Sequence, residues 1–176
     1  IAEGPETLSV TVSAPGGITV GASTTLNDNG AYRLTSGQDG SALQPAQAEV
    51  FDGSQEQSLL GPQDTLNDSD VLEGVGGAAV LNAVFGNSLL PLVTPSMTGI
   101  GTVNAAFVSS LTQMFLSFQD TTGTDSANIT RISGGQSAGI LDMNGEVMAL
   151  SAANTVLPVP NLIFDYQPGK APSTVS

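Results

Sequence analysis

The stretch Asp70–Phe85, which reads DVLEGVGGAAVLNAVF, decides the fold that this sequence predicts. Glycines at Gly74 and Gly77 interrupt it and indicate a tight turn. Leucines stand nine residues apart, at Leu72 and Leu81. This spacing indicates a short repeated unit in which glycines turn the chain and one large apolar residue enters the core.

The spacing resembles the nonapeptide G-G-x-G-x-D-x-U-x of parallel β-helices. In that motif glycines make the turns, the aspartate binds Ca²⁺, and the large apolar residue U points into the core. Gly74, Gly77 and Leu81 occupy matching positions. Val75 replaces the second glycine and Ala79 replaces the aspartate, so the second unit lacks its carboxylate. The resemblance therefore implies a solenoid-like fold and leaves calcium at this turn in question.

Three neighbouring segments extend the resemblance: DTLN at 64–67, LNAVF at 81–85 and TGIGTVNA at 98–105. They resemble segments of bacterial surface-layer and RTX-type adhesin proteins, and together with the repeat they cover about a quarter of the chain. This family resemblance implies an extracellular or cell-surface location, and it implies calcium as the cofactor to consider.

The residue types present restrict any metal site to oxygen ligands. The chain has neither histidine nor cysteine, which leaves calcium or magnesium as the candidate ions. The densest group of oxygen-bearing side chains is Asp64, Asn67, Asp68 and Asp70. The sequence thus predicts a Ca²⁺ site at these four residues, with a solvated aspartate-rich turn as the alternative.

Charge excludes two classes of partner. Three basic residues against sixteen acidic ones give a formal net charge of −13, which repels a phosphate backbone. The basic residues Arg33, Arg131 and Lys170 form no cluster that would attract an anionic membrane surface. Because no run of eighteen apolar residues occurs, we also expect no membrane insertion.

Short strands dominate the predicted secondary structure, because 21 glycines and 10 prolines divide the chain into brief segments. The fold class expected is mainly β, with the strands in a sandwich or a solenoid-like arrangement. Leu8–Ser13 alternates apolar and polar residues, as a strand with one buried face does. Ala105–Leu116 has the apolar spacing of one short helix, with a buried strand pair as the alternative. Asn144 and Gly145 indicate a hairpin turn.

Composition divides the chain into three parts. Residues 1–34 are expected to form N-terminal β strands, and residues 35–166 a β-rich core domain that begins with a polar loop segment at 35–70. Residues 167–176 contain two prolines, a glycine and two serines, which is typical of a tail or an assembly linker.

Two catalytic motifs fail on inspection. Gly135–Gly139 reads GQSAG and matches the nucleophile elbow, but a chain without histidine has no imidazole to activate Ser137. Gly74–Ala79 matches a loose dinucleotide fingerprint, yet no acidic residue follows before Asp120 to bind the ribose. We therefore expect that the protein is not an enzyme.

The function predicted is that of a non-enzymatic extracellular structural protein that self-assembles into a surface array, sheath or fibre. Its partners would be copies of itself, in contact through the apolar segment Val80–Val93 and through main-chain pairing of an extended terminus such as Glu6–Ser13. The alternatives are a calcium- or glycan-binding module of a larger secreted adhesin and a phage tail or capsid accessory protein.

Overall fold

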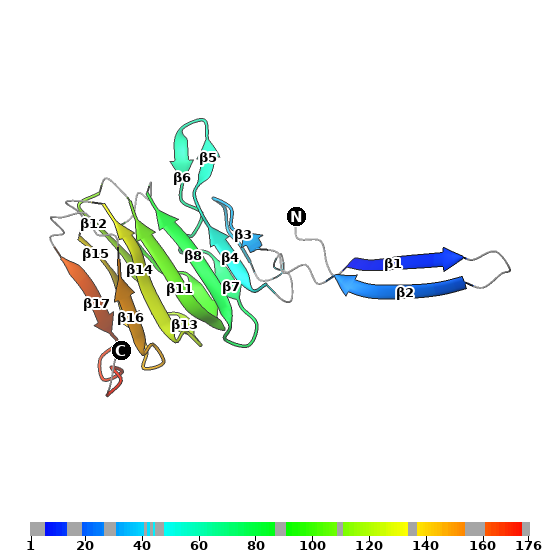
Figure 1. Ribbon diagram of the computed structural model, residues 1–176. Coiled ribbons are helices and arrows are strands. Elements are labelled where there is room, and N and C mark those ends of the chain that lie inside the picture. The colour runs from blue at the N-terminus through cyan, green and yellow to red at the C-terminus, as the bar shows by residue number, and fades with distance from the viewer. Residues whose placement is uncertain are drawn as a thin grey trace.

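The computed structural model describes residues 31–40, 42, 44, 48–86, 91–108, 111–133, 137–153 and 161–173 in full, and residues 6–13 and 19–26 as main chain. All elements in these residues are β-strands, and no α-helix occurs among them (Figure 1). The mainly β fold class is confirmed. Of the two architectures predicted, the solenoid is the one observed.

Three parallel sheets build the solenoid. The six-stranded sheet consists of β3 (Ala31–Arg33), β4 (Val50–Gly53), β8 (Ala79–Phe85), β11 (Ile100–Phe107), β14 (Ser126–Ile132) and β16 (Ala149–Ala152), in that spatial order. The four-stranded sheet consists of β9 (Leu92–Val93), β12 (Gln113–Ser117), β15 (Ser137–Met143) and β17 (Leu162–Tyr166). The three-stranded sheet consists of β7 (Val71–Glu73), β10 (Ser96–Thr98) and β13 (Thr121–Thr122).

From β7 to β15 the chain visits the three sheets in the same order on each coil, and the solenoid has about three turns. Leu81, Val103, Ala127 and Leu150 are Cα partners along one row of the six-stranded sheet. Successive partners are therefore 22, 24 and 23 residues apart. The nine-residue spacing of Leu72 and Leu81 instead joins two sheets of a single coil, and both side chains are fully buried.

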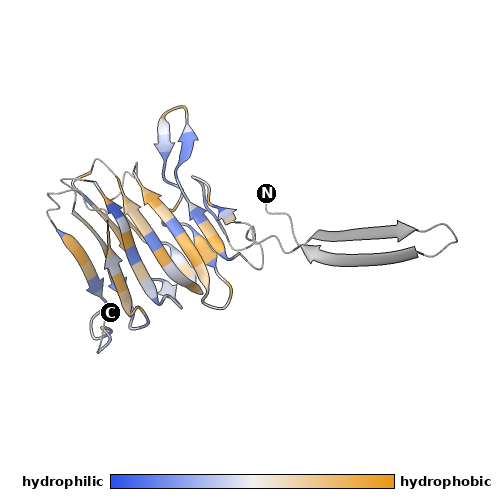
Figure 2. Cartoon of the chain, viewed as in Figure 1, coloured by the Kyte–Doolittle hydropathy of each residue, from blue (hydrophilic) through white to orange (hydrophobic). Residues whose placement is uncertain are grey.

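The core lies inside the coils because strands alternate inward and outward residues. Along β8, Leu81, Ala83 and Phe85 are buried while Asn82 is exposed. Phe85 stacks on Phe107 one coil further on, with ring centroids 5.3 Å apart. Figure 2 shows the resulting bands of apolar and polar residues across the six-stranded sheet. Like residues thus stack on like residues from coil to coil.

Glycines allow the coils to approach one another at the corner before the six-stranded sheet. Gly77, Gly99 and Gly123 all have positive φ angles, of 72°, 68° and 76°. A Cβ atom added to Gly101 would lie 1.9 Å from the carbonyl oxygen of Gly77, which no side chain tolerates. The glycines of the opening stretch therefore make turns, as their spacing predicts.

The segment that precedes β7 closes the N-terminal end of the solenoid. Leu34, Ala48 and Leu66 are each at most 2% exposed, and Phe51 on β4 is fully buried. The predicted polar loop at 35–70 thus contains β4 and a two-stranded antiparallel hairpin, β5 (Glu56–Ser58) and β6 (Gly61–Gln63). This end of the core is covered by the chain itself.

Ahead of the solenoid, β1 (Glu6–Ser13) and β2 (Thr19–Leu26) form an antiparallel hairpin. The predicted strand at Leu8–Ser13 is confirmed. It is paired with β2 along its whole length, so Glu6–Ser13 is one strand of a hairpin and not an unpaired strand (Figure 1).

Two local predictions are wrong. The expected helix at Ala105–Leu116 is instead the end of β11 and most of β12, which lie in different sheets. Its helical spacing arises because Phe107 and Met114 are buried on two separate strands that a short corner joins. Asn144 and Gly145 connect β15 to β16, which lie in two parallel sheets, and so do not form a hairpin turn.

Two sets of hydrogen bonds join parts of the chain that the predicted boundaries separate. β3, within 1–34, pairs with β4 of the core sheet. In the tail, the amide N–H of Gln167 donates to the carbonyl oxygen of Met143. The boundaries at residues 34 and 166 stay predictions, but residues on both sides of each boundary are hydrogen-bonded to one another.

Candidate functional site

Two of the four predicted calcium ligands anchor their loop to distant main chain. Asp64 Oδ1 accepts hydrogen bonds from the amide of Gly86 and from Nε2 of Gln55, both at 2.8 Å. Asp68 Oδ1 accepts from the amide of Thr94 at 2.6 Å. Each carboxylate thus ties the segment before β7 to a neighbouring part of the same solenoid.

The other two, Asn67 and Asp70, bond to one another. The amide of Asn67 donates to Asp70 Oδ2 at 2.9 Å, and the amide of Asp39 donates to Asp70 Oδ1 at 2.9 Å. The side-chain amide of Asn67 donates to the carbonyl oxygen of Gly37 at 2.9 Å. The sequence cluster is therefore a set of loop anchors, and in the described residues no group of three or more carboxylates is arranged to hold a metal ion. Calcium at this site stays a prediction.

Asp39 is a buried acid that the sequence did not single out. It is 1% exposed, and its Oδ2 accepts from the amide of Thr35 at 2.7 Å while its Oδ1 accepts from the hydroxyl of Tyr32 at 3.2 Å. Burial raises the pKa of neighbouring Asp70 to about 6, although the amides of Asp39 and Asn67 lower it. Burial likewise raises the pKa of Tyr32, with the Asp39 charge adding to the effect.

The two motifs with a catalytic appearance have structural roles. Ser137 is the first residue of β15, and its amide donates to the carbonyl oxygen of Thr112 at 2.9 Å. Gly74 lies at the corner after β7, where its amide donates to Thr98 at 2.8 Å. Both therefore serve the stacking of one coil on the next.

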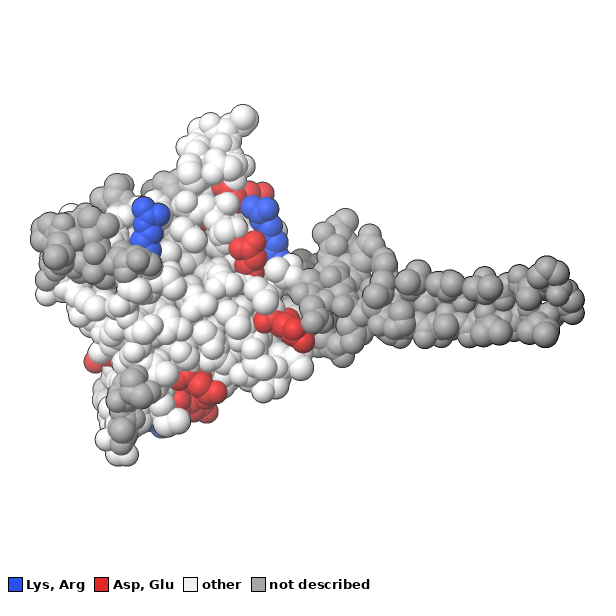
Figure 3. All heavy atoms as spheres, in the orientation of Figure 1, with Lys and Arg blue, Asp and Glu red and all other residues white. Residues whose placement is uncertain are grey.

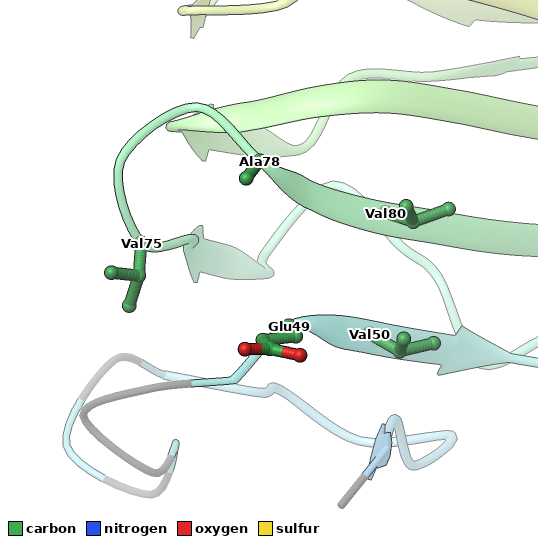
Figure 4. A pocket seen from close by; sticks show the side chains of 5 residues that line it. All are labelled: Glu49, Val50, Val75, Ala78 and Val80. Carbon is green, nitrogen blue, oxygen red and sulfur yellow. The ribbon is translucent and has the colours of Figure 1, made fainter. Parts of the chain in front are cut away.

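A shallow hollow lies on the outer side of the six-stranded sheet near its N-terminal end (Figure 4). The described residues that line it are Glu49, Val50, Val75, Ala78 and Val80. Val75 is 45% exposed. Among these described residues, one carboxylate lies beside small aliphatic side chains, so they offer mainly apolar contact.

The last coil is the most distinctive surface of the molecule. Among the described strands, β16 has β14 as its partner and β17 has β15, and each lies at the edge of its sheet. Leu150, Phe164 and Tyr166 pack against the core but are only half-buried. Their partners one coil earlier, Ala127, Ile140 and Met143, are fully buried.

Leu162, which begins β17, shows the same contrast with its neighbour. Its exposed fraction is 43%, whereas its partner Ala138 is fully buried. The inward-facing row of the four-stranded sheet thus loses its cover at β17. We call the surface formed by β16 and β17 the open end.

The third sheet is finished differently at this end. Gly74 and Gly99 each donate their amide to a strand carbonyl of the following coil, at 2.8 and 2.9 Å. The amide of Gly123 instead donates to the Glu146 carboxylate at 2.6 Å. Asn144 Nδ2 donates to the carbonyl oxygen of Thr121 at 2.9 Å. Two side chains therefore replace the missing strand beside β13, and no such replacement is seen in the described residues beside β16 or β17.

A row of amide side chains crosses the outer face of the six-stranded sheet. Asn104 Nδ2 donates to Asn82 Oδ1 at 2.9 Å, and Asn128 Nδ2 donates to Asn104 Oδ1 at 3.0 Å. The hydroxyl of Ser151 donates to Asn128 Oδ1 at 2.6 Å. The similar segments LNAVF at 81–85 and VNAAF at 103–107 were a visible signal of this row and of the coil length.

Charge is spread thinly over the surface. On the face that Figure 3 shows, acidic side chains lie apart from one another and most of the described surface is uncharged. Within the part of the chain that the structure describes, no helix has the length and apolarity to cross a membrane. Comparison of the chain with protein-family models, curated proteins and solved structures gave no match.

Proposed function

We propose that the protein is a structural subunit of the cell exterior that assembles with copies of itself into an array, sheath or fibre. The observation that carries this proposal is the open end, where two adjacent parallel sheets stop at strands with a partner on one side. Such edges template pairing with another chain, and natural proteins that stay monomeric usually protect them.

The difference between the covered edge at β13 and the uncovered edges at β16 and β17 supports assembly. The edge at β13 is covered by Asn144 and Glu146, so the chain contains the means to blunt an edge. β16 reads ALSA and β17 reads LIFDY, with neither proline nor lysine in them. The edges at β16 and β17 therefore have sequences that favour main-chain pairing with another strand.

The contact surface differs from the one predicted from sequence. In the segment Val80–Val93, Leu81, Phe85 and Val93 are buried within the solenoid, and Leu89 and Leu90 lie outside the described residues. This segment supports the fold of one chain. The open end takes its place as the surface through which subunits would meet.

The setting proposed is extracellular. The net charge of −13 and the absence of cysteine suit a salty or calcium-containing exterior, where cations offset repulsion between acidic subunits. The resemblance to surface-layer and RTX-type adhesin proteins supports the same location, and calcium would then act on assembly from Asp64, Asn67, Asp68 and Asp70.

The experiment is sedimentation velocity and electron microscopy of the purified full chain over a wide range of concentration, with calcium present and after chelation. Ordered polymers are expected, and their loss on chelation would support the predicted ion. A chain that stays monomeric in every condition would refute the structural role.

A second candidate is a glycan-binding module, which the outer amide row favours. Amide side chains both donate and accept hydrogen bonds, and Asn82, Asn104 and Asn128 present them on neighbouring strands. Glycan-array binding of the full chain, with N104L as the variant, tests this. Binding by the unmodified chain alone would support it.

A further inference from the structure

We infer that the open end receives the β1–β2 hairpin of a second copy, so that assembly is head-to-tail and main-chain pairing at β17 links one subunit to the next. This inference rests on the proposed self-assembly and names its two contact surfaces. One is the edge strand β17, and the other is the N-terminal hairpin.

The hairpin has the properties expected of an element that pairs with another copy. An isolated two-stranded hairpin is marginally stable in water and needs a third strand or a packing partner. Its register pairs Val10 with Ala22 and Val12 with Val20. Because alternate residues of a strand share a face, the sequence predicts one apolar face for the hairpin, with serine, threonine and glycine on the other face.

The open end has the properties of the matching acceptor. Half-buried Phe164 and Tyr166 and exposed Leu162 form an apolar margin along β17. β17 has five residues, and each hairpin strand has eight, so one hairpin strand is long enough to pair with the whole edge. An added strand supplies main-chain hydrogen bonds and covers that margin, as in β-strand addition.

Charge permits this contact between two acidic copies. The sixteen residues of β1 and β2 contain one charged residue, Glu6, and β17 contains one, Asp165. The other fourteen of the sixteen acidic residues lie elsewhere in the chain. Bringing the hairpin to the open end therefore places few like charges together.

The length of the chain argues against pairing between the hairpin and β17 of the same copy. Five strand spacings separate β3 from the last coil, about 24 Å at the usual distance between strands. The chain from Leu26 to Ala31 spans at most about 18 Å when fully extended. The hairpin that pairs with β17 must therefore come from another copy, and such a heterologous contact generates open filaments or closed rings.

The first test places a lysine on each contact surface. L162K puts a charge on the β17 edge, and V10K puts one on the apolar face of the hairpin. Both are expected to lose all species larger than the monomer in sedimentation velocity. L92K and S9K are the matched controls, because Leu92 is 39% exposed at the opposite edge of the same sheet and Ser9 lies on the other face of the hairpin. Both controls are expected to assemble.

The second test mixes the two inactive variants. L162K keeps a sound hairpin and V10K keeps a sound open end, so one intact contact remains between them. We expect a one-to-one heterodimer and no polymer. Circular dichroism and thermal melting of each variant establish that the solenoid is folded before mixing.

The outcomes separate this inference from the proposed function. A monomeric unmodified chain refutes both. An unmodified chain that polymerises while L162K and V10K do so equally well refutes the inference and keeps the structural role. Loss of assembly in L92K would indicate that β17 stacks on β9 instead. Folded L162K and V10K that are each monomeric and form no heterodimer would show that the hairpin of one copy does not contact the open end of another, which also overturns the inference.

Discussion

At one end of the solenoid Phe51 is fully buried on β4, whereas at the other Phe164 on β17 is only half-buried. The two phenylalanines differ because of what lies beyond their strands. β3 pairs with β4, and its Tyr32 contacts Phe51 with ring centroids 6.1 Å apart, while no described strand lies beyond β17. In a solenoid each coil buries its neighbour, so the ends show whether the chain is complete in itself or requires a partner.

The largest expected effect is on the free energy of unfolding when Phe51 on β4 is shortened. F51A should lower the free energy of unfolding by about 3–5 kcal/mol, because it removes a fully buried ring and leaves a cavity. F164A should cost about 1–2 kcal/mol in the dilute chain, because its ring is already partly exposed. Denaturant unfolding of both variants measures the difference. Equal losses would mean that the two ends are equally covered in solution.

The dependence of stability on protein concentration gives a second comparison of Phe51 and Phe164. If a second copy covers Phe164, the loss caused by F164A should rise with concentration, because assembly stabilises only the chain that can bind. The loss caused by F51A should not change in this way. Thermal melting at several concentrations gives the result, and two parallel series would argue against coverage of the open end.

The next effect concerns Asp70 and its neighbour Asp39 in the segment before β7. The folded pKa of Asp70 is raised to about 6 from 3.8, so the folded chain holds this proton more tightly than the unfolded chain. Its contribution to stability is therefore full below about pH 4 and is lost as the pH rises through about 6. D70N loses one acceptor and should cost about 1–3 kcal/mol at pH 4.

The sign of the change with pH is the check. The stability gap between the unmodified chain and D70N should narrow between pH 4 and pH 7, because only the unmodified chain loses the contribution of the protonated Asp70. Urea unfolding at each pH measures the gap, with D165N at the open end as the control. A gap that widens with pH would show that the amides of Asp39 and Asn67 outweigh burial.

The smallest effect tests the protected edge. E146A removes the carboxylate that accepts from the amide of Gly123, and because Glu146 is exposed the loss of stability should be below about 1 kcal/mol. The informative readout is assembly, since a third edge becomes available beside β13. Mass distributions of E146A against E146Q, which keeps an acceptor, should show more association in E146A. Identical distributions would mean that Asn144 alone suffices.

Individual residues show how far sequence reasoning reaches. The alternation of Leu8–Ser13 predicted a strand correctly, and Gly77 and Leu81 predicted a turn and an inward residue. The same reasoning assigned a helix to 105–116, because one apolar spacing arises both from a helix face and from two strands across a corner. Local pattern alone contains nothing that separates these two structures.

The candidate sites divide in the same way. The aspartates near β7 were found from sequence, but their roles as anchors to Gly86, Thr94 and Asp39 depend on residues 22 to 31 positions away. The open end was not found, because β16 and β17 read like any other short strand. An edge is defined by the absence of a neighbour, which is a property of the whole sheet.

By itself the sequence determined that this chain is built of short β-strands and that its charge repels nucleic acid, since composition and two-residue alternation act locally. The tertiary structure alone decided which strands pair with one another and how the two ends of the solenoid differ. These features come from main-chain pairing between residues far apart in the chain. Such pairing forms only when several coils stack together, because a single coil cannot bury its own apolar face.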